Sequence, residues 1–439
     1  MQKQKLYKIL KIFFIVVASL AFVLAIYFLP PVHSRLAWRV DSLRAQIYYF
    51  FNPPEAVAFS PGQQDVMDEL FSQTQTAQAL EPTPTPEPTL NPTEEVSPTP
   101  TITETPLPTA TSLPPRVILE GVEYEEQHFN NCGPANLSMA LSFWGWEGNQ
   151  TDIQLVVKPR IDDRNVMPYE MVEYVQSYTP FNAIMRHGGN LELLKELIAA
   201  GFPVIIEKGY EVEVHGWMGH YGVLTGYDDN EGFFIMQDSY DNNPDFPITY
   251  EQIKQNWRAF NYIYVIVYPY ARESEVHEIL GPRLNETYSF ELAAEIARAE
   301  KEELEGRDLF FAWFNYGTSQ QNLLNYYGAA QAFDFAFNEV YPNIPDNKLP
   351  WRIMWYQTGP YFAYYFTGRY QDVIDLANET FRRSFVNAIE ETWVWRGRAR
   401  LAMGDREGAI DDFRAALEWH PGWWVATNEL RQLGVSPEP

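Results

Sequence analysis

The sequence predicts two folded regions, an α+β domain over residues 117–270 and an all-α region of helical repeats over residues 286–435. The first prediction rests on a helical pattern that is followed by several β-rich runs, which Gly, Asp and Asn separate. The second rests on two segments that share one spacing of Trp, Gly, Ala and Phe. A long apolar run and a Pro/Thr-rich segment precede both regions, and a chain of 439 residues is long enough to hold them all.

The apolar run from Ile12 to Leu29 contains eighteen uncharged residues, which is the lower limit for a helix that spans a bilayer. Four lysines precede it, so the positive-inside tendency puts residues 1–11 in the cytoplasm. We therefore expect a single-pass signal anchor at residues 12–29 in a bacterial cell membrane, with the remainder on the extracytoplasmic side. A cleaved signal peptide is the alternative, although Pro30-Pro31 stands where a small-residue cleavage site would be.

Residues 30–80 are expected to form a juxtamembrane region, and residues 81–115 a disordered linker. The linker has eleven prolines and ten threonines in 35 positions, a composition that builds no core and favours polyproline II. At ~3.1 Å per residue it could extend over roughly 100 Å. We expect it to hold the folded regions away from the membrane.

The charge of the chain is uneven, with a formal net charge of -26. The first fifty residues carry about +6, which leaves the remainder near -32. Such an acidic surface repels phosphate backbones, so we expect no nucleic-acid partner. The aromatic content (13 Trp, 27 Tyr and 28 Phe) is typical of folded domains. One cysteine cannot form an intramolecular disulfide, so packing must stabilise the fold.

Within residues 117–270, two segments have helical spacing and end on glycine. ANLSMALSFWG ends at Gly145, and NLELLKELIAAG begins with Asn190 as an N-cap and ends at Gly201. Four runs that follow are typical of strands: PVIIEKGY, HYGVLTGY, GFFIMQD and NYIYVIVYP. Helices first and strands later indicate an α+β domain.

After Pro282 the pattern becomes helical and repeats itself. The first repeat places Trp and Gly four residues apart, then Ala and Phe four apart, then Pro, and the second does the same; the positions are Trp313, Gly317, Ala329, Phe333, Pro342 and Trp393, Gly397, Ala409, Phe413, Pro421. This spacing resembles the tetratricopeptide repeat, in which these pairs pack two antiparallel helices. The segment between the two repeats, PYFAYYFTGRYQDVIDLA, lacks the Trp, and we interpret it as a degenerate middle unit. Three units are about the minimum for a stable stack.

The only cysteine, Cys132, precedes Gly133-Pro134 and the first helical pattern. Because proline is favoured in the first turn of a helix, we expect Cys132 at a helix N-terminus, where the helix dipole favours thiolate. A free cysteine is commonly a small buried hydrophobic residue. Such a residue gains nothing from this position, whereas a nucleophile does. We predict that Cys132 is a nucleophile.

A thiolate nucleophile needs a base, and the best-placed of the seven histidines is His220, which starts the run HYGVLTGY and is expected at the start of a strand. Asp238 ends the next β-rich run, so a hairpin would bring its carboxylate to the imidazole. Gln127 lies five residues before Cys132. Its side-chain amide could join the Cys132 backbone N–H in stabilising an oxyanion.

Taken together, these four candidate residues and their surroundings resemble the papain-like double-glycine (bacteriocin-leader) peptidases, in their stand-alone branch. The matching pieces are Gln127, NCGPA around Cys132, HYGVLTGY from His220 and QDSY around Asp238. The resemblance covers roughly residues 120–270 and implies a papain-like fold with a Cys–His–Asp triad. It implies that Cys132 is the nucleophile, His220 the general base and acid, Asp238 the group that orients His220, and Gln127 the oxyanion donor. The family commonly has Asp-Pro where this chain has Asp238-Ser239. No GxxxxGK loop occurs, so we do not expect coupling to a transporter.

These observations predict a membrane-anchored, extracytoplasmic cysteine peptidase that needs no cofactor and cleaves a protein or peptide substrate. The helical repeats would dock that substrate or a protein partner. Two alternatives remain open: the same triad could act as an amidase on cell-wall peptides or as an acyltransferase, or the chain could be a non-enzymatic protein-binding scaffold. A metal site is not expected, because His215 and His220 match no usual zinc spacing.

Overall fold

The computed structural model describes residues 113–212, 216–240 and 243–437, together with isolated helical positions between residues 11 and 51. The predicted cytoplasmic tail, anchor, juxtamembrane region and linker lie almost entirely outside these residues and stay predictions. Within the described part of the chain, no helix has both the length and the hydropathy that a membrane span requires.

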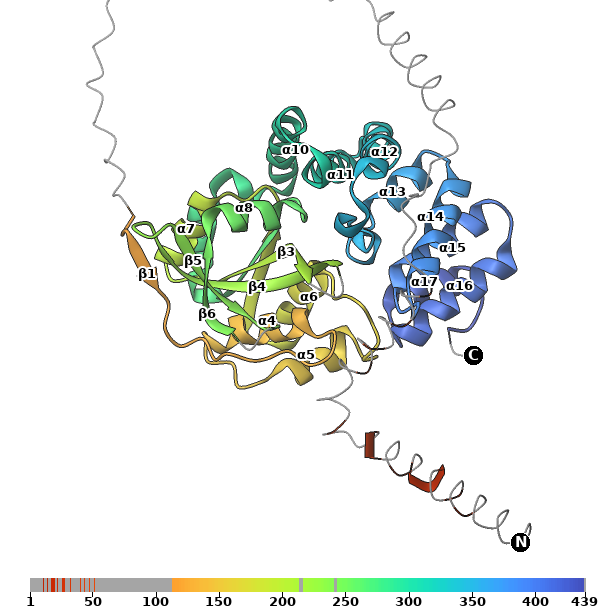
Figure 1. Cartoon of the computed structure of the whole chain (residues 1–439), viewed down its shortest axis with the longest axis horizontal. Helices are drawn as coiled ribbons and strands as arrows, with labels where there is room; N and C mark the ends of the chain where they lie inside the picture. The colour runs from red at the N-terminus through yellow and green to blue at the C-terminus, as the bar shows by residue number, and fades with distance from the viewer. Residues whose placement is uncertain are drawn as a thin grey trace, which may run out of the picture.

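An antiparallel sheet of seven strands forms the centre of the α+β domain (Figure 1). The strands run in the order β2-β7-β3-β4-β5-β6, and β1 pairs with the far end of β4. Their bounds are β1 Arg116–Ile118, β2 Phe181–Arg186, β3 Val204–Val212, β4 Gly216–Asp228, β5 Phe233–Asp238, β6 Asn243–Thr249 and β7 Tyr264–Pro269. The four predicted β-rich runs correspond to β3, β4, β5 and β7, whereas β1, β2 and β6 were not predicted.

The helices of this domain cover both faces of the sheet. Their bounds are α4 Cys132–Ser142, α5 Gln150–Val157, α6 Pro168–Tyr178, α7 Leu191–Ala199, α8 Tyr250–Arg258 and α9 Glu273–Leu280. One core lies between the sheet and α4 and α6, and contains Ile205 and Val265. The other lies under α7, α8 and α9, and contains Val204 and Ile266. Because neighbouring strand residues face opposite cores, both faces must be apolar, which explains the unbroken runs PVII and YVIVY.

Strand β4 differs from the sequence expectation in one important respect. His220 was expected to start the strand, but β4 begins at Gly216 and His220 lies inside it, 3% exposed. Gly219 also lies inside the strand. Glycine is needed there because a Cβ would lie 2.6 Å from the Phe260 ring and 3.0 Å from the Tyr356 ring. Those aromatic rings occupy the space of the missing side chain, which a local reading of the sequence cannot detect.

The C-terminal region is helical and arches along one side of the α+β domain (Figure 1). Its helices are α10 Glu286–Glu303, α11 Gly306–Asn322, α12 Tyr326–Phe335, α13 Gly359–Phe366, α14 Tyr370–Arg383, α15 Glu390–Ala402, α16 Arg406–Trp419 and α17 Trp424–Gln432, and a five-residue π-helix at Ala336–Val340 continues α12. Successive helices pack against one another from α10 to α17, and α11 with α12, α13 with α14 and α15 with α16 are the pairs that correspond to the predicted units.

The residues of the predicted repeat pattern lie at the contacts within two of these pairs. A Cβ on Gly317 would lie 2.8 Å from the Phe333 ring, and a Cβ on Gly397 would lie 2.7 Å from the Phe413 ring. Glycine therefore allows the two helices of each pair to approach closely. This packing is what the Trp–Gly and Ala–Phe spacing predicts, and the assignment to the tetratricopeptide family stays a prediction.

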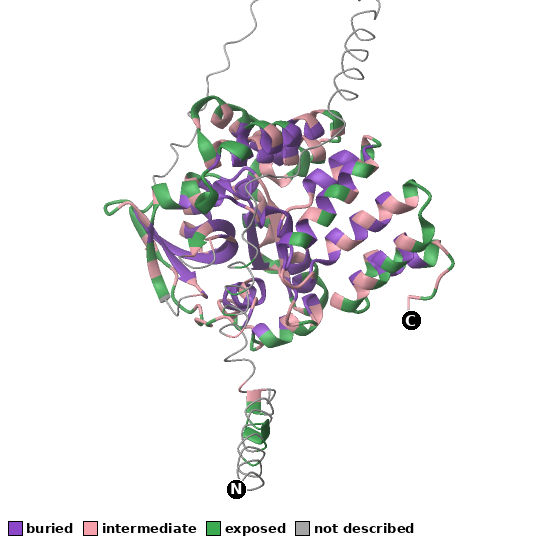
Figure 2. Ribbon diagram, turned by 45° about the vertical axis from the view of Figure 1, so that its right-hand side comes forward, coloured by how far each residue is buried: buried purple, intermediate pink, exposed green. Residues whose placement is uncertain are grey.

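The two folded regions share buried contacts, and buried (purple) segments occur in both of them (Figure 2). Trp217 and Phe260 of the α+β domain belong to the same apolar core as α11 to α14. Asn315 Nδ2 donates to the Arg258 carbonyl at 2.7 Å, and Arg352 Nη1 donates to the Trp217 carbonyl at 2.9 Å, both in buried surroundings. The helical region is therefore packed firmly on the α+β domain.

Candidate active site

Cys132 is the first residue of α4, and its side chain is partly exposed. The helix begins there because Gly133 and Pro134 occupy its first turn, where proline needs no N–H partner. A Cβ on Gly133 would lie 3.0 Å from Val166 and 3.6 Å from the Tyr221 ring, so glycine lets the start of α4 approach β4 closely. The thiol therefore lies where the helix N-terminus meets the strand that carries His220.

His220 lies between Cys132 and Asp238. A hydrogen bond joins its side chain to Cys132. Its Nε2 lies 2.8 Å from Asp238 Oδ1, at the end of β5, and donates to that carboxylate. Because Nε2 faces Asp238, Nδ1 is left for the thiol. The structure thus brings these three predicted residues into one hydrogen-bonded series.

Asp238 has a second cationic partner that the sequence did not indicate. Lys208 Nζ lies 3.2 Å from Asp238 Oδ2, and Lys208 is directly opposite His220 across the β3–β4 pair. Asp238 Oδ1 also accepts from the Tyr240 backbone N–H at 3.0 Å. Burial alone would raise the pKa of Asp238, but His220 and Lys208 hold it well below its usual range. The carboxylate is therefore ionised at neutral pH.

The charges in the series favour a thiolate beside an imidazolium. Burial opposes the charged form of Cys132, but the hydrogen bond and the charge of His220 lower the pKa of the thiol below its ordinary value. Burial likewise opposes the charged form of His220, but Asp238 and Cys132 raise the pKa of the imidazole above its ordinary value. Lowered thiol and raised imidazole pKa values are the requirements of an ion pair that is reactive at neutral pH.

Gln127 is held beside this series by a chain of buried hydrogen bonds. Its backbone N–H donates to the Ser239 carbonyl at 2.9 Å, and its Oε1 accepts from Ser239 Oγ at 3.0 Å. Ser239 Oγ in turn accepts from Asn136 Nδ2 at 2.9 Å. Since the amide oxygen faces Ser239, the amide nitrogen is left as the donor. Ser239 therefore orients Gln127.

Asn136 is a second residue that the sequence analysis did not single out. It is fully buried in α4, and its Nδ2 lies within hydrogen-bond distance of the Cys132 carbonyl, the Tyr221 carbonyl and Ser239 Oγ. A polar residue one helical turn after Cys132, within an apolar stretch, was the available signal. Lys208 had no comparable signal, because its strand VIIEKGYEV also contains Glu207 and Glu211.

Other candidate ligands and bases lie elsewhere. His128 is exposed on the segment before α4. His187 is half-buried and stacks on Phe290, and the burial of its ring lowers its pKa to about 4. His215, which the sequence analysis considered for a metal site, lies outside the described residues.

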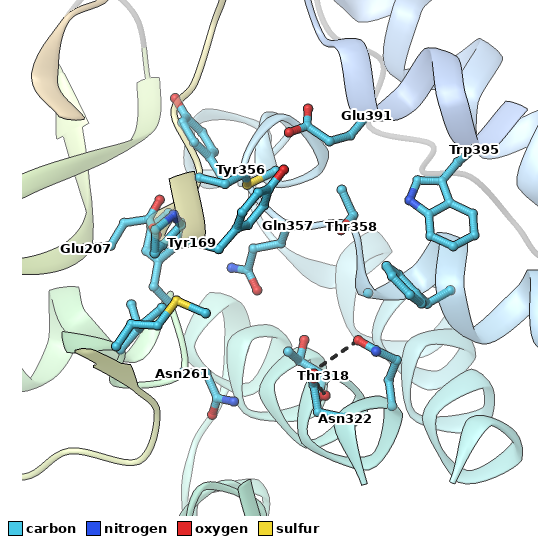
Figure 3. Close-up of a pocket in the computed structure, with 18 of the residues that line it drawn as sticks. Tyr169, Glu207, Asn261, Thr318, Asn322, Tyr356, Gln357, Thr358, Glu391 and Trp395 are labelled. Atoms are coloured by element: carbon cyan, nitrogen blue, oxygen red, sulfur yellow. Dashed lines mark hydrogen bonds between the residues drawn. The ribbon is translucent and has the colours of Figure 1, made fainter. Parts of the chain in front are cut away.

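A cavity of about 460 Å³ lies between the α+β domain and the helical region (Figure 3). Glu207 and Tyr356 line it, and both lie close enough to Cys132 for the thiolate charge to raise their pKa values, in addition to the larger effect of burial. The opposite wall comes from α15, with Glu391 and Trp395. Glu207 is paired with Tyr221 across β3 and β4, and Tyr356 packs over Gly219, so the cavity reaches the part of β4 that carries His220. Gln127, Cys132, His220 and Asp238 are not among the residues that line it.

Residues 119–265 match the model of the Peptidase_C39 like family. Two solved structures are similar: one described as a C39-like peptidase from Bacillus anthracis, and xylellain, a cysteine protease from Xylella fastidiosa. The first has 19% identity and a TM-score of 0.29, and the match covers 35% of this chain and 96% of the Bacillus anthracis chain. The second has 15% identity and a TM-score of 0.28, and the match covers 36% of this chain and 87% of xylellain. No curated protein matches the chain.

The family match confirms the prediction of a papain-like cysteine peptidase domain. It ends at residue 265, so it does not test the tetratricopeptide prediction for the helical region.

The charge arrangement predicts how alkylation of Cys132 depends on pH. Because the thiolate is the reactive form and its pKa is lowered, the rate of alkylation by iodoacetamide should stay high at pH values where an ordinary thiol is protonated. Asp238→Asn removes the charge that supports the imidazolium, so the midpoint of the rate profile should move to higher pH. Cys132 is the only cysteine, so the mass increase of the intact protein measures the reaction.

Asp229→Asn is the matched control, because Asp229 lies just after β4 at the opposite end of the β4–β5 hairpin and pairs with Lys195. Its profile should coincide with that of the wild type. An Asp238→Asn profile that also coincides with the wild type would contradict the ion pair.

Proposed function

We propose that this chain, whose residues 119–265 form a cysteine peptidase domain of the Peptidase_C39 like family, hydrolyses peptide bonds of protein substrates through Cys132, His220 and Asp238. The observation that carries the proposal is the hydrogen-bonded series of these three side chains, with the pKa of the thiol lowered and that of the imidazole raised. A scaffold protein without activity would have no use for this charge arrangement.

In the first step the Cys132 thiolate attacks the carbonyl carbon of the scissile bond, and the electron pair of the carbonyl moves to its oxygen. The Cys132 backbone N–H, at the start of α4, has no acceptor within the helix, and the side-chain amide of Gln127 supplies a second donor. These two groups stabilise the oxyanion. Ser239 keeps the Gln127 amide nitrogen turned away from itself, as the donor.

In the second step the C–N bond breaks, and His220 gives its Nδ1 proton to the departing amine. The acyl group remains on Cys132 as a thioester. His220, now neutral, takes a proton from water, and the resulting hydroxide attacks the thioester. The acid is released, and the thiolate and the imidazolium are restored. Asp238 keeps the imidazole oriented through Nε2 in every step.

Two substitutions test these roles. Cys132→Ala removes the nucleophile, so hydrolysis of an unfolded protein such as casein should fall by about 10⁴-fold or more. Gln127→Ala should lower kcat by about 10²–10³-fold, because one oxyanion donor is lost. The measurement is the initial rate of peptide release, with peptidoglycan fragments assayed in parallel for amidase activity.

His128→Ala is the matched control, because this exposed residue is next to Gln127 and has no role in the mechanism. It should keep nearly the wild-type rate. A Cys132→Ala protein as active as the wild type would exclude the mechanism, and turnover of peptidoglycan fragments alone would favour the amidase alternative.

The helical region, residues 286–435, is proposed to consist of tetratricopeptide repeats that dock the substrate. The close glycine–phenylalanine contacts within two helix pairs support the repeat assignment. The cavity between the two regions supports the docking role, because its walls come from both of them. Its lining is largely aromatic and aliphatic with a few acidic groups, which suits extended peptide segments that carry apolar and basic side chains.

A tryptophan that fills the cavity tests this docking role. Thr358 lies in the middle of the cavity wall (Figure 3). Thr358→Trp should lower kcat/KM for a protein substrate by roughly tenfold or more, because about 1.4 kcal/mol of lost binding corresponds to that factor. Alkylation of Cys132 by iodoacetamide should be unchanged.

Gln371→Trp adds the same side chain at an exposed position of α14 and is the control. Equal kcat/KM values for the two tryptophan variants would remove the cavity from substrate binding.

The location of the chain is proposed to be the extracytoplasmic side of a bacterial membrane. The lysines before residues 12–29 and the Pro/Thr-rich linker support an anchored domain on a long spacer. The full chain should stay with membranes after a high-pH wash, whereas Leu20→Arg with Leu24→Arg should release it, since each arginine costs about 3 kcal/mol at the centre of a span. A wild-type chain found in the medium without its first thirty residues would show a cleaved signal peptide instead.

A further inference from the structure

A cluster of buried ionisable side chains lies at the junction of the two folded regions, away from the residues of the mechanism. Asp163 comes from the turn between α5 and α6, Glu390 is the first residue of α15, and His420 directly follows α16. One ligand atom of each lies within 4.8 Å of the others, and the exposed fractions of the three residues are 1%, 2% and 8%. Segments more than 200 residues apart thus bring their side chains to one point.

The distances fit the coordination of a small cation. His420 Nδ1 lies 3.1 Å from Glu390 Oε1 and 3.9 Å from Glu170 Oε1, and Glu170 in α6 is also buried. Two ligand atoms that are each ~2.0–2.1 Å from a tetrahedral zinc ion are roughly 3.3 Å apart. The ligand atoms of Asp163, Glu390 and His420 lie within 4.8 Å of one another, so side-chain adjustments of up to about 1.5 Å would bring them to this spacing. His420 also stacks on Trp423, which keeps its ring in place.

The cluster contains an oxygen that the protein does not satisfy. Among the described residues, Asp163 Oδ2 is buried without a hydrogen-bond partner, while Oδ1 accepts from the Asn165 backbone N–H. Lys158 is buried nearby, but its Nζ donates to the carbonyls of Asn130 and Asp163 rather than to a carboxylate. A buried carboxylate oxygen without a partner is costly, and a cation would satisfy it.

The number of acidic side chains points the same way. Asp163, Glu170 and Glu390 are all buried, with exposed fractions of 1%, 6% and 2%. The N-terminal end of α15 accounts for an acidic residue at position 390, because helix N-termini favour anions. It does not account for Asp163, Glu170 and a histidine gathered at the same point.

We propose that Asp163, Glu390 and His420, with Glu170 as a fourth ligand, bind a zinc ion. An imidazole together with carboxylates is typical of zinc, whereas calcium and magnesium take oxygen ligands alone. The sequence analysis expected no metal site, because His215 and His220 match no usual zinc spacing. The ligands proposed here are far apart in sequence and follow no zinc motif. Only the packing of the helical region on the peptidase domain assembles them.

The zinc ion would hold the helical region against the peptidase domain. Asp163 and Glu170 belong to the peptidase domain, and Glu390 and His420 belong to the helical region. Two hydrogen bonds cross the junction at the same place, from Arg160 Nε to the Glu418 carbonyl and from the Arg164 N–H to the Ala388 carbonyl. Because α15 begins at Glu390 and also carries Trp395 of the cavity wall, the ion would position that wall relative to Cys132.

The test is the zinc content and thermal stability of the full chain, purified without a histidine tag and with Cys132→Ser so that the active-site thiol cannot bind the ion. Elemental analysis should find about one zinc per chain. Chelation with subsequent dialysis should remove it, and returning zinc at about 100 times its Kd should raise the Tm by roughly 5 °C. Calcium at the same concentration should not raise it.

Glu390→Gln and His420→Gln should each lower the zinc content to below about a tenth and abolish the rise in Tm. Glu407→Gln is the control, because it removes the same charge from an exposed position on α16. Should either ligand variant fail to fold, the zinc content and Tm response of the Cys132→Ser chain still decide the question. A chain without zinc whose Tm does not respond to it would overturn the proposal, as would zinc binding that survives in both folded ligand variants.

Discussion

The candidate active site depends on the buried amide of Asn136. Its Nδ2 contacts the Cys132 carbonyl, the Tyr221 carbonyl and Ser239 Oγ, so one side chain links the start of α4, strand β4 and the end of β5. Each of these segments carries a candidate active-site residue at or next to the contact. Because a buried polar group without partners is costly, the three segments can separate only at a penalty. The amide therefore fixes the spacing that the charges of the site require.

The electrostatics of the site follow from this spacing. The series Cys132, His220, Asp238 and Lys208 alternates in sign when the thiol is ionised, so each group stabilises its neighbour. This alternation of charge raises the pKa of the imidazole and lowers the pKa of the thiol. Lys208 also explains how Asp238 remains charged although it is largely enclosed, since a buried carboxylate with cations on both oxygens is strongly favoured as the anion.

The helical region packs beside the candidate active site and also supplies side chains that contact the strand carrying His220. Tyr356 fills the space over Gly219, next to His220, and Arg352 holds the Trp217 carbonyl of the same strand. The cavity between the two regions has one wall from each of them. Because the two regions share an apolar core, a change at their junction would be transmitted to the cavity wall. The shape of the cavity and the packing of the two regions are thus linked in this chain.

The sequence by itself determined the residues with local signals: Cys132 before Gly-Pro at a helix start, His220 and Asp238 on successive strands, and Gln127 a few residues upstream. Their order along the chain also sufficed to indicate the papain-like fold, which the family match confirms. Only the tertiary structure showed the partners Lys208, Asn136 and Ser239, the interior position of His220, the shared cavity and the cluster around His420. The physical reason is that cross-strand register and packing between distant segments determine these features. Neither leaves a periodicity or a spacing in the sequence that could be read in advance.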